Sequence, residues 1–279
     1  MSEDSSVRVL RHILVAADGS PHSQAALRAA VRLAASVEAE VDGLFVEDEQ
    51  LLRAAALPFA AEVRTHSQSP APLTDRRIER QLRRQAERAR TTLQRAAEQW
   101  DVPHSFRVLQ GDVSRELLSA ASEADLLALG KTSTDSSRQR LGSTARTVLS
   151  ESNRSVLVLR SPVDLQSQVL TYFDGSPASE RALGLAVRLA RRGDPGQLRV
   201  FLPGATADAL REAVQARCEG LRAALTVHAL PPIGPDWLTV LPHQPRGGVV
   251  VLPHECPLLS STSLQRFLYE VDRPLLLVR

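Results

Sequence analysis

The sequence predicts an α/β protein made of two open, five-stranded parallel sheets in tandem. Two observations lead to this fold class: the chain repeats itself, and within each repeat apolar runs alternate with segments of helical periodicity. The chain has 279 residues, which is longer than most single hydrophobic cores. We therefore expect two domains, residues 1–161 and residues 162–279.

The repeat is clearest near the start of each half. Residues 12–35 and 168–191 share thirteen identities in twenty-four positions, and both contain Asp-Gly-Ser-Pro. A second match joins 141–160 to 260–279, with an offset that is shorter by 37 residues. Solenoid repeats recur every 20 to 50 residues or so, and the offset here is much larger. It indicates a duplicated domain whose second copy is shortened inside.

The first half alternates between strands and helices. Its apolar runs predict strands at 9–16, 41–46, 105–110, 126–129 and 156–160, and its periodic segments predict helices at 21–37, 74–100, 114–122 and 142–152. Runs such as HILVAA and SVLVLR are apolar throughout, which is typical of parallel strands covered by helices on both faces. Sheets of this kind bind ligands at the carboxyl ends of their strands.

The second half repeats this order in compressed form. Its strands are predicted at 169–173, 198–202, 225–230, 248–252 and 274–278. Residues 231–248 are rich in proline and glycine, so we expect the third helix of this half to be short or missing. Residues 160–168 are expected to link the two halves.

Composition and charge exclude several classes of protein. The chain has 34 Lys and Arg against 32 Asp and Glu, a balance that gives no reason to expect nucleic-acid binding by the whole chain. It contains no apolar stretch of about 18 residues that would span a membrane, and its first residues do not resemble a signal peptide. Two cysteines without a disulfide framework suit a reducing compartment. We expect a cytoplasmic protein with no nucleic-acid or membrane partner.

Two glycines in the first half mark a candidate binding site. Gly130 is followed by Lys-Thr, as at the end of a P-loop, but position 125 is Asp where a P-loop requires glycine. Gly130 instead ends a predicted strand, and Gly142-Ser143-Thr144 begins a predicted helix. The free N–H groups and positive dipole end of such a helix attract phosphate. Alternatively, Gly142 permits a tight turn and a hydroxyl caps the helix.

Asp18 follows the first predicted strand, so it belongs at the same edge of the sheet as Gly130. An aspartate before a helix is often a simple cap. A carboxylate at one end of this edge and a phosphate-binding helix start at the other would together suit a mononucleotide. We therefore predict a mononucleotide pocket here, with Asp18 directed at the adenosine.

Three segments resemble the signature segments of universal stress proteins: ILVAADGSPHSQAALRAAVRLAA, GDVSRELLSAASEADLLALG and LGSTARTVLSESNRSVLVLR. The resemblance covers both halves, as in tandem members of that family. It implies a Rossmann-like fold of the adenine nucleotide alpha hydrolase-like type. It also implies a stress-response regulatory module whose first domain binds ATP or another adenine nucleotide, although no residue pattern indicates an accompanying Mg²⁺.

The resemblance also implies which residues contact the nucleotide. Nucleotide-binding members of the family carry Gly, two residues, Gly, nine residues and then Gly-Ser or Gly-Thr. In this chain Ser133 replaces the middle glycine, and only eight residues follow it before Gly142. Asp18 would contact adenosine, Val46 would offer backbone to adenine, and Leu129 would line the ribose. The full set implied by the resemblance is Asp18, Val46, Leu129, Gly130, Ser133, Gly142, Ser143 and Thr144.

Other functions were weighed against nucleotide binding. Ser133, the shortened loop and a second half in which Pro253 aligns with Gly130 also suit an interaction scaffold that binds no nucleotide. No catalytic arrangement and no metal-ligand spacing appears in the sequence. Slow ATP hydrolysis, or self-phosphorylation at Ser143 or Thr144, would rest on family resemblance alone.

Three further features concern surfaces. The helix at 74–100 has eight arginines against four acids and places Ile78, Leu82, Ala86, Ala89, Leu93 and Trp100 on one stripe, so its charged face is expected to be solvated. The apolar insertion after the second strand would serve as a lid, an interface or plain packing. We expect strands 156–160 and 274–278 to pair within the chain, and two chains to join as a homodimer around Leu57 and Phe59.

Overall fold

The computed structural model describes most of the chain. The described residues are 10–57, 61–62, 71–72, 75–130, 142–159, 168–191, 196–221, 224–230, 247–256, 259, 264, 268 and 273–279. Within them no helix is long and apolar enough to cross a membrane.

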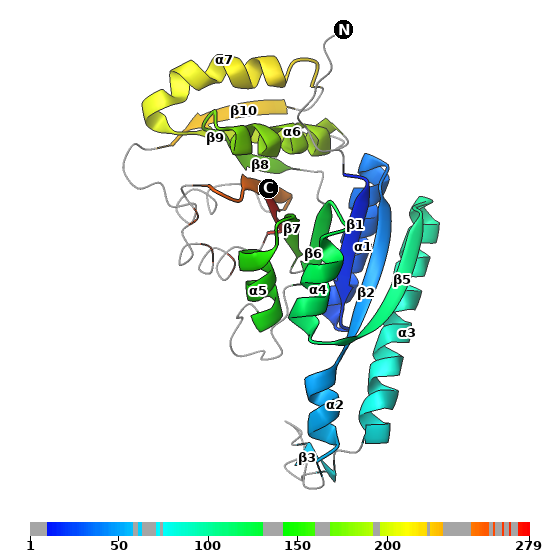
Figure 1. The fold of residues 1–279 in the computed structure, drawn as a ribbon. Helices are drawn as coiled ribbons and strands as arrows, with labels where there is room; N and C mark the ends of the chain where they lie inside the picture. Colours follow the sequence, from blue (N-terminus) through cyan, green and yellow to red (C-terminus); the bar gives the residue numbers. More distant parts are fainter. Residues whose placement is uncertain are drawn as a thin grey trace.

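Helices and strands of the first half fall close to the predicted ranges (Figure 1). They are β1 (His12–Ala17), α1 (Pro21–Val37), β2 (Glu40–Asp48), α2 (Glu49–Ala55), β3 (Ala61–Glu62), β4 (Ala71–Pro72), α3 (Asp75–Trp100), β5 (His104–Gly111), α4 (Val113–Ala121), β6 (Leu126–Gly130), α5 (Ser143–Glu151) and β7 (Ser155–Leu159).

The second half is shorter and follows the same order. Its elements are β8 (Val169–Tyr172), α6 (Pro177–Arg191), β9 (Gln197–Leu202), the 3₁₀ turn η1 (Gly204–Thr206), α7 (Ala207–Arg217), β10 (Ala224–Ala229), β11 (Val249–Pro253) and β12 (Leu275–Val278). The prediction of a short or missing third helix concerns residues 231–246, which lie outside the described residues.

All ten long strands belong to one continuous sheet, in the order β10-β9-β8-β11-β12-β7-β6-β1-β2-β5. Each half contributes five neighbouring strands, and within each half the first strand lies between the second and the fourth. Every pair inside a half is parallel. The predicted α/β fold with parallel five-stranded units is confirmed.

The two halves meet through their last strands, as predicted. β12 pairs with β7 in antiparallel fashion, with Leu276 opposite Leu157 at the centre of the register. All residues of both strands are buried. This pairing gives hydrogen-bond partners to the backbone N–H and C=O groups at the edge of each half. At an open apolar edge these groups would have no partners within the sheet.

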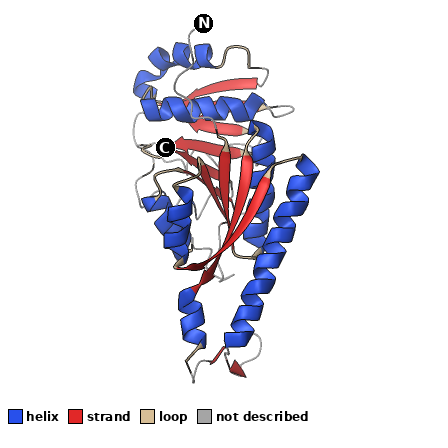
Figure 2. Ribbon diagram, turned by 45° about the vertical axis from the view of Figure 1, so that its right-hand side comes forward, coloured by secondary structure: helices blue, strands red, loops and turns tan. Residues whose placement is uncertain are grey.

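Helices cover both faces of the sheet and enclose two large apolar cores (Figure 2). α1, α3, α6 and α7 pack on one face, where Leu27 and Leu93 are almost fully buried. α4 and α5 pack on the other, where Leu117 and Val148 join the core. This two-faced burial explains why the strands are apolar throughout.

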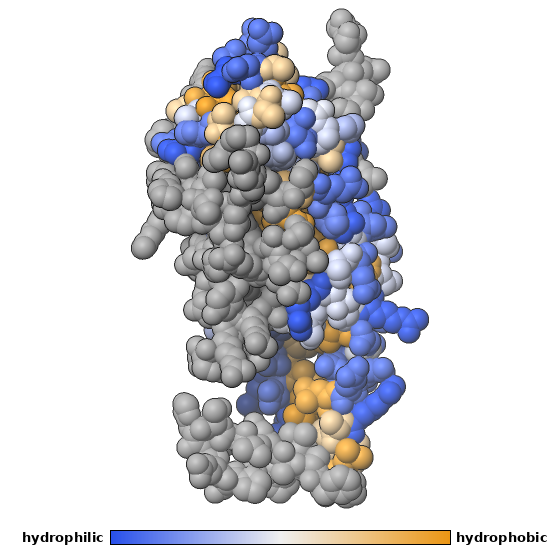
Figure 3. All heavy atoms as spheres, turned by 90° about the vertical axis from the view of Figure 1, so that its left-hand side faces the viewer, coloured by the Kyte–Doolittle hydropathy of each residue, from blue (hydrophilic) through white to orange (hydrophobic). Residues whose placement is uncertain are grey.

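The insertion after β2 extends the molecule beyond the sheet. α2 packs against α3, and both helices project past the strand ends (Figure 1). Leu51 and Leu57 are exposed there, and an apolar area appears low on the face shown in Figure 3, at the height of α2. Phe59 lies outside the described residues. Trp100, at the end of the apolar stripe of α3, is 46% exposed, and the Arg32 guanidinium lies 5.8 Å from the centre of its ring.

Candidate functional site

The candidate site lies where the chain leaves the sheet in two directions. β1 and β6 are parallel neighbours, and the helix that follows β1 packs on one face of the sheet while α5, which follows β6, packs on the other. The chain segments that follow the two strands therefore run to opposite faces of the sheet, and a crevice opens between these segments. Open α/β sheets characteristically bind ligands at such a switch point.

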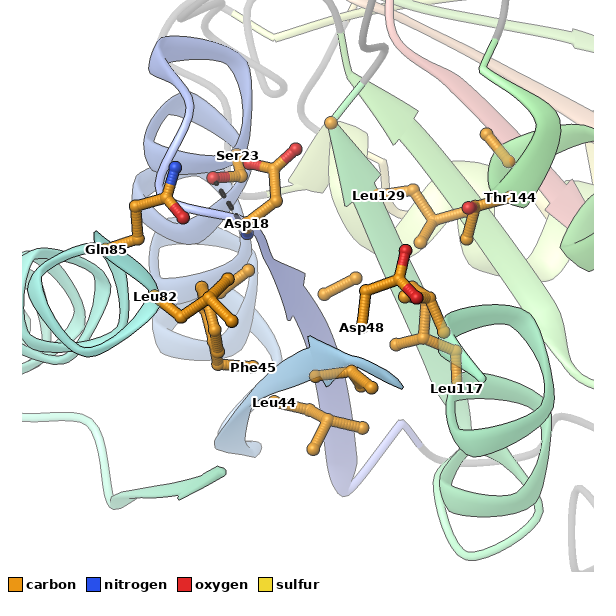
Figure 4. A pocket seen from close by; sticks show the side chains of 16 residues that line it. Asp18, Ser23, Leu44, Phe45, Asp48, Leu82, Gln85, Leu117, Leu129 and Thr144 are labelled. Carbon is orange, nitrogen blue, oxygen red and sulfur yellow. Dashed lines mark hydrogen bonds between the residues drawn. The ribbon is translucent and has the colours of Figure 1, made fainter. Parts of the chain in front are cut away.

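A pocket of about 240 Å³ occupies this crevice (Figure 4). Its walls come from the ends of β1, β2 and β6 and from the helices α3, α4 and α5. The described lining residues are Ala16, Ala17, Asp18, Ser23, Leu44, Phe45, Val46, Asp48, Leu82, Gln85, Val113, Leu117, Leu129, Gly130, Thr144 and Ala145. Most of these side chains are apolar and a few are polar, a composition typical of small-molecule sites.

Asp18 is held by the turn that joins β1 to α1. Its backbone N–H donates to Ser23 Oγ at 3.3 Å, and its Oδ1 accepts from the Ser20 N–H at 2.8 Å (Figure 4 shows the first bond). Gly19 has a φ of +74°, a left-handed conformation that glycine adopts without strain. Ser20 then caps α1 by accepting from the Ser23 N–H, and Pro21 occupies the first helical turn.

The second half builds the same turn around Asp174. The Asp174 N–H donates to Ser179 Oγ at 3.3 Å, and Asp174 Oδ1 accepts from the Ser176 N–H at 3.0 Å. Burial would raise the pKa of Asp174, but the hydrogen bonds from Ser176 and Ser179 outweigh burial and lower the pKa. The Asp-Gly-Ser-Pro motif is therefore a helix-start turn in both halves, and only in the first half does its aspartate line the pocket described above.

Gly130 is required by close packing at the pocket floor. A Cβ at this position would lie 2.8 Å from both the His22 carbonyl carbon and the Ser23 nitrogen, which belong to the backbone of α1. Backbone atoms cannot move aside as a flexible side chain can. Gly130 thus lets the end of β6 approach the first turn of α1 and keeps the wall of the pocket intact.

The start of α5 supplies the polar end of the pocket. Gly142 is its N-cap, with φ of −58° and no side-chain hydrogen bond to the helix. Gly142 has no side chain that could cap the first N–H groups of α5, and the dipole end of the helix is positive. Thr144 and Asp48 both line the pocket and lie on the same side of it in Figure 4. Gly142 and Ser143 stand at the helix start but are not among the lining residues.

Larger side chains occupy the corresponding positions of the second half. The repeat aligns Ala16 with Tyr172, and strand register then aligns Leu44 with Phe201 and Gly130 with Pro253. Tyr172 and Phe201 are 5% and 2% exposed, and both join the apolar core. Burial, with smaller effects of Asp174 and Cys256, raises the pKa of Tyr172 to about 12.

The structure brings most of the predicted residues together. Asp18, Val46, Leu129, Gly130 and Thr144 all line one pocket. Ser133 lies outside the described residues.

Sequence reasoning missed the opposite wall, made by Leu82 and Gln85 of α3 with Phe45 of β2. Figure 4 shows Gln85 and Leu82 on the side of the pocket opposite Thr144 and Leu117. The apolar stripe of the helix predicted Leu82 as buried, but nothing in the sequence relates α3 to the end of β1.

The described part of the pocket carries two negative charges. Asp18 and Asp48 are the charged residues among the described lining residues, which include no arginine or lysine. No cluster of three or more metal-ligating side chains is found within the described part of the chain. Within the described part of the site, the start of α5 is a source of positive potential.

Comparisons with known proteins agree with this architecture. A family model described as "Universal stress protein family" matches residues 10–160. A universal stress protein of Methanocaldococcus jannaschii is 28% identical over 155 residues, which are 54% of this chain and 83% of that protein.

Two solved structures match almost the whole chain. A universal stress protein from Archaeoglobus fulgidus covers 96% of this chain and 98% of its own, with 17% identity and a TM-score of 0.69. A functionally unknown protein from Pseudomonas aeruginosa covers 96% of this chain and 92% of its own, with 14% identity and a TM-score of 0.61. At these identities the structural matches show the fold.

Proposed function

Because the chain belongs to the universal stress protein family, we propose that it is a stress-response regulatory module that binds ATP or a related adenine nucleotide in its first half. The observation that carries this proposal is the convergence of Asp18, Val46, Gly130 and Thr144 on one pocket at the switch point of the sheet.

The lining of the pocket supports an assignment of each part of the nucleotide. The apolar side chains of Leu44, Val46 and Leu117 would take the adenine ring, with the Val46 backbone offering hydrogen bonds. Asp18 would accept hydrogen bonds from the adenosine, and Leu129 and Gly130 would border the ribose.

The phosphates would lie toward the start of α5. The backbone N–H groups of Ser143 and Thr144 and their hydroxyls would bind phosphoryl oxygens there. Asp48 lies on the same side of the pocket as Thr144, so a nucleotide with several phosphates would meet like charge unless a cation accompanies it. This arrangement favours nucleotides with few phosphates, or nucleotides bound together with Mg²⁺.

We propose that the second half binds no nucleotide. Tyr172 and Phe201 fill the space that Ala16 and Leu44 leave open in the first half, and Pro253 lacks the backbone donor that a phosphate requires. The expected stoichiometry is a single nucleotide per chain.

Calorimetric titration of the full chain with ATP, ADP, AMP, cyclic AMP and adenosine tests the proposal. A matched pair of variants isolates the site: Asp18→Asn and Asp174→Asn remove the same charge from the same turn, and asparagine keeps an oxygen for the Ser20 or Ser176 N–H. Asp18→Asn should weaken binding about tenfold, the range expected for a charge-assisted hydrogen bond, while Asp174→Asn should leave affinity unchanged.

Absence of binding to every adenine compound at millimolar concentration would reject the proposal in favour of a nucleotide-free interaction scaffold. Equal losses in the two variants would show that the turn, and not the pocket, determines affinity. A nucleotide that co-purifies with the protein, identified by mass spectrometry after gentle unfolding, would reject the scaffold.

We also propose how the protein is organised around this site. Residues 1–161 and 162–279 act as two domains joined through β7 and β12. The exposed Leu57 and its surroundings would join two chains as a homodimer, which light scattering of the full chain can test. Cys218 and Cys256 are buried and form no disulfide, which supports a location in the reducing cytoplasm.

A further inference from the structure

The outer face of α3 carries a row of arginines beside the pocket. A shallow hollow of about 540 Å³ runs along this face, lined by Arg77, Arg80, Gln81, Arg84, Gln85 and Arg88. Gln85 also lines the nucleotide pocket, so the hollow and the pocket meet at this residue. α3 runs along the side of the molecule and projects past the sheet (Figure 2).

The positive charge of this hollow is not neutralised by its own lining. None of the described lining residues is acidic. Arg84 and Arg88 are exposed, and neither forms an ion pair with an acid in the described part of the chain. α3 has eight arginines and four acids, whereas the whole chain has a net charge of only +2. Much of the positive charge of the protein is therefore gathered on this helix.

The spacing of the row suits a linear ligand. Successive arginines of the row are three or four residues apart, which places neighbouring side chains on the same side of a helix roughly 5 to 6 Å apart. From Arg77 to Arg88 the helix rises about 16 Å. A single small anion would engage one or two of these guanidinium groups, whereas a chain of repeated charges would engage all of them.

The residue types that line the hollow indicate which kind of large partner it fits. The described lining consists of arginine and glutamine, whereas protein interfaces and membrane-bound helices present apolar or aromatic side chains at their centre. Guanidinium groups bind phosphoryl oxygens through paired N–H donors, and glutamine amides add neutral donors. The described lining includes no aromatic side chain on which nucleic-acid bases could stack. We propose that this hollow binds inorganic polyphosphate, a linear polyanion of phosphoryl groups.

This inference goes beyond nucleotide binding and does not require an occupied pocket. It is tested on the full chain in nucleotide-free buffer, with two fluorescent probes of equal charge: inorganic polyphosphate and single-stranded oligothymidylate. Oligothymidylate contains no adenine, so it does not report on the adenine site. Dissociation constants are measured by anisotropy at several salt concentrations.

The chain offers a matched control for the charge change. Arg84→Gln with Arg88→Gln removes two charges from the hollow. Arg83→Gln with Arg90→Gln removes two charges from the same helix, where these arginines already pair with glutamates one turn away. Since both pairs are exposed, thermal melting should show that all variants fold.

The parent should bind polyphosphate more tightly than oligothymidylate, and affinity should fall steeply with salt because phosphate contacts release counterions. The Arg84/Arg88 double variant should lose about tenfold or more in affinity. The slope of the logarithm of affinity against the logarithm of salt concentration should become shallower by about one to two, roughly one for each phosphate contact removed. The Arg83/Arg90 control should stay within about twofold, a change expected of charges already paired. Arg84→Lys with Arg88→Lys should recover most of the affinity.

Tighter binding of oligothymidylate than of polyphosphate would overturn the proposal in favour of a nucleic-acid partner. Failure of the parent to bind polyphosphate would also overturn it. So would equal losses in the two double variants, because they would reflect the overall charge of α3 and not the hollow. Adenine-nucleotide titration is a separate measurement, so the two proposals can fail independently.

Discussion

Replacing Ala16 with tyrosine should close the pocket of the first half. The repeat places Tyr172 at the corresponding position of the second half, where the side chain is 5% exposed within the apolar core. Ala16 lines the 240 Å³ pocket of the first half. A tyrosine buries roughly 150 to 250 Å² of surface, so it would fill much of the space that an adenine ring would use.

The size of the effect follows from the contact area that the ligand would lose. If the tyrosine displaces about 100 Å² of apolar contact, the loss at 25 cal/mol per Å² is about 2.5 kcal/mol. That free energy corresponds to about 70-fold in the dissociation constant. The melting temperature should not fall, because the new side chain fills a cavity and buries apolar surface.

Calorimetric titration with ATP and AMP measures the loss, and thermal unfolding measures the stability. Val108→Tyr is the control, because Val108 is 39% exposed on the edge strand β5. Leu44→Phe introduces into the first half the residue that the second half has at the corresponding position, Phe201. This change adds less volume than Ala16→Tyr. An Ala16→Tyr protein that melts normally and still binds within about threefold of the parent would refute the assignment of the ligand to this pocket, because the lost contact predicts a far larger change.

Two further predictions concern stability. Gly130→Ala should destabilise the fold by about 1 to 3 kcal/mol, because its Cβ would approach the backbone of His22 and Ser23 at 2.8 Å; urea unfolding measures the change, and no change would mean that α1 moves aside freely. The second concerns Tyr172, whose pKa is raised from 10.0 to about 12 mainly by burial. The neutral side chain is favoured in the folded state, so its contribution to stability is complete below pH 10 and is lost as the pH rises towards 12. Tyr172→Phe should remove this loss, and an unchanged alkaline unfolding profile would contradict it.

The arrangement of strands and helices was largely predictable because it depends on local patterns. The helix from Pro21 to Val37 has the bounds that periodicity indicated, since Ser20 caps it and Pro21 fixes its first turn. The pairing of β7 with β12 followed from two apolar end strands that each needed a partner. Trp100 belongs to the apolar stripe of α3 but is exposed at the end of that helix, where the Arg32 guanidinium lies over its ring.

The pocket was predictable only on the side that the strand ends provide. Asp18, Val46 and Gly130 lie at carboxyl ends of neighbouring strands, so topology alone brings them to one edge. Gln85 belongs to the middle of a long helix, and its place depends on how α3 crosses the turn at Gly19: a Cβ on Gly19 would come within 2.8 Å of the Gln85 Cβ. Such a tertiary contact leaves no periodic signal in the sequence.

Comparison of the two halves separates what the fold needs from what the ligand needs. Asp174 makes the same pair of hydrogen bonds as Asp18, although Tyr172 and Phe201 fill the space beside it. The shared turn is thus retained beside larger side chains, because it starts a helix in both halves. The Asp-Gly-Ser-Pro motif alone is therefore weak evidence of binding in a protein of this kind. Under the proposal that only the first half binds a nucleotide, the small side chain of Ala16 and the glycine at the end of β6 are the differences that provide the room.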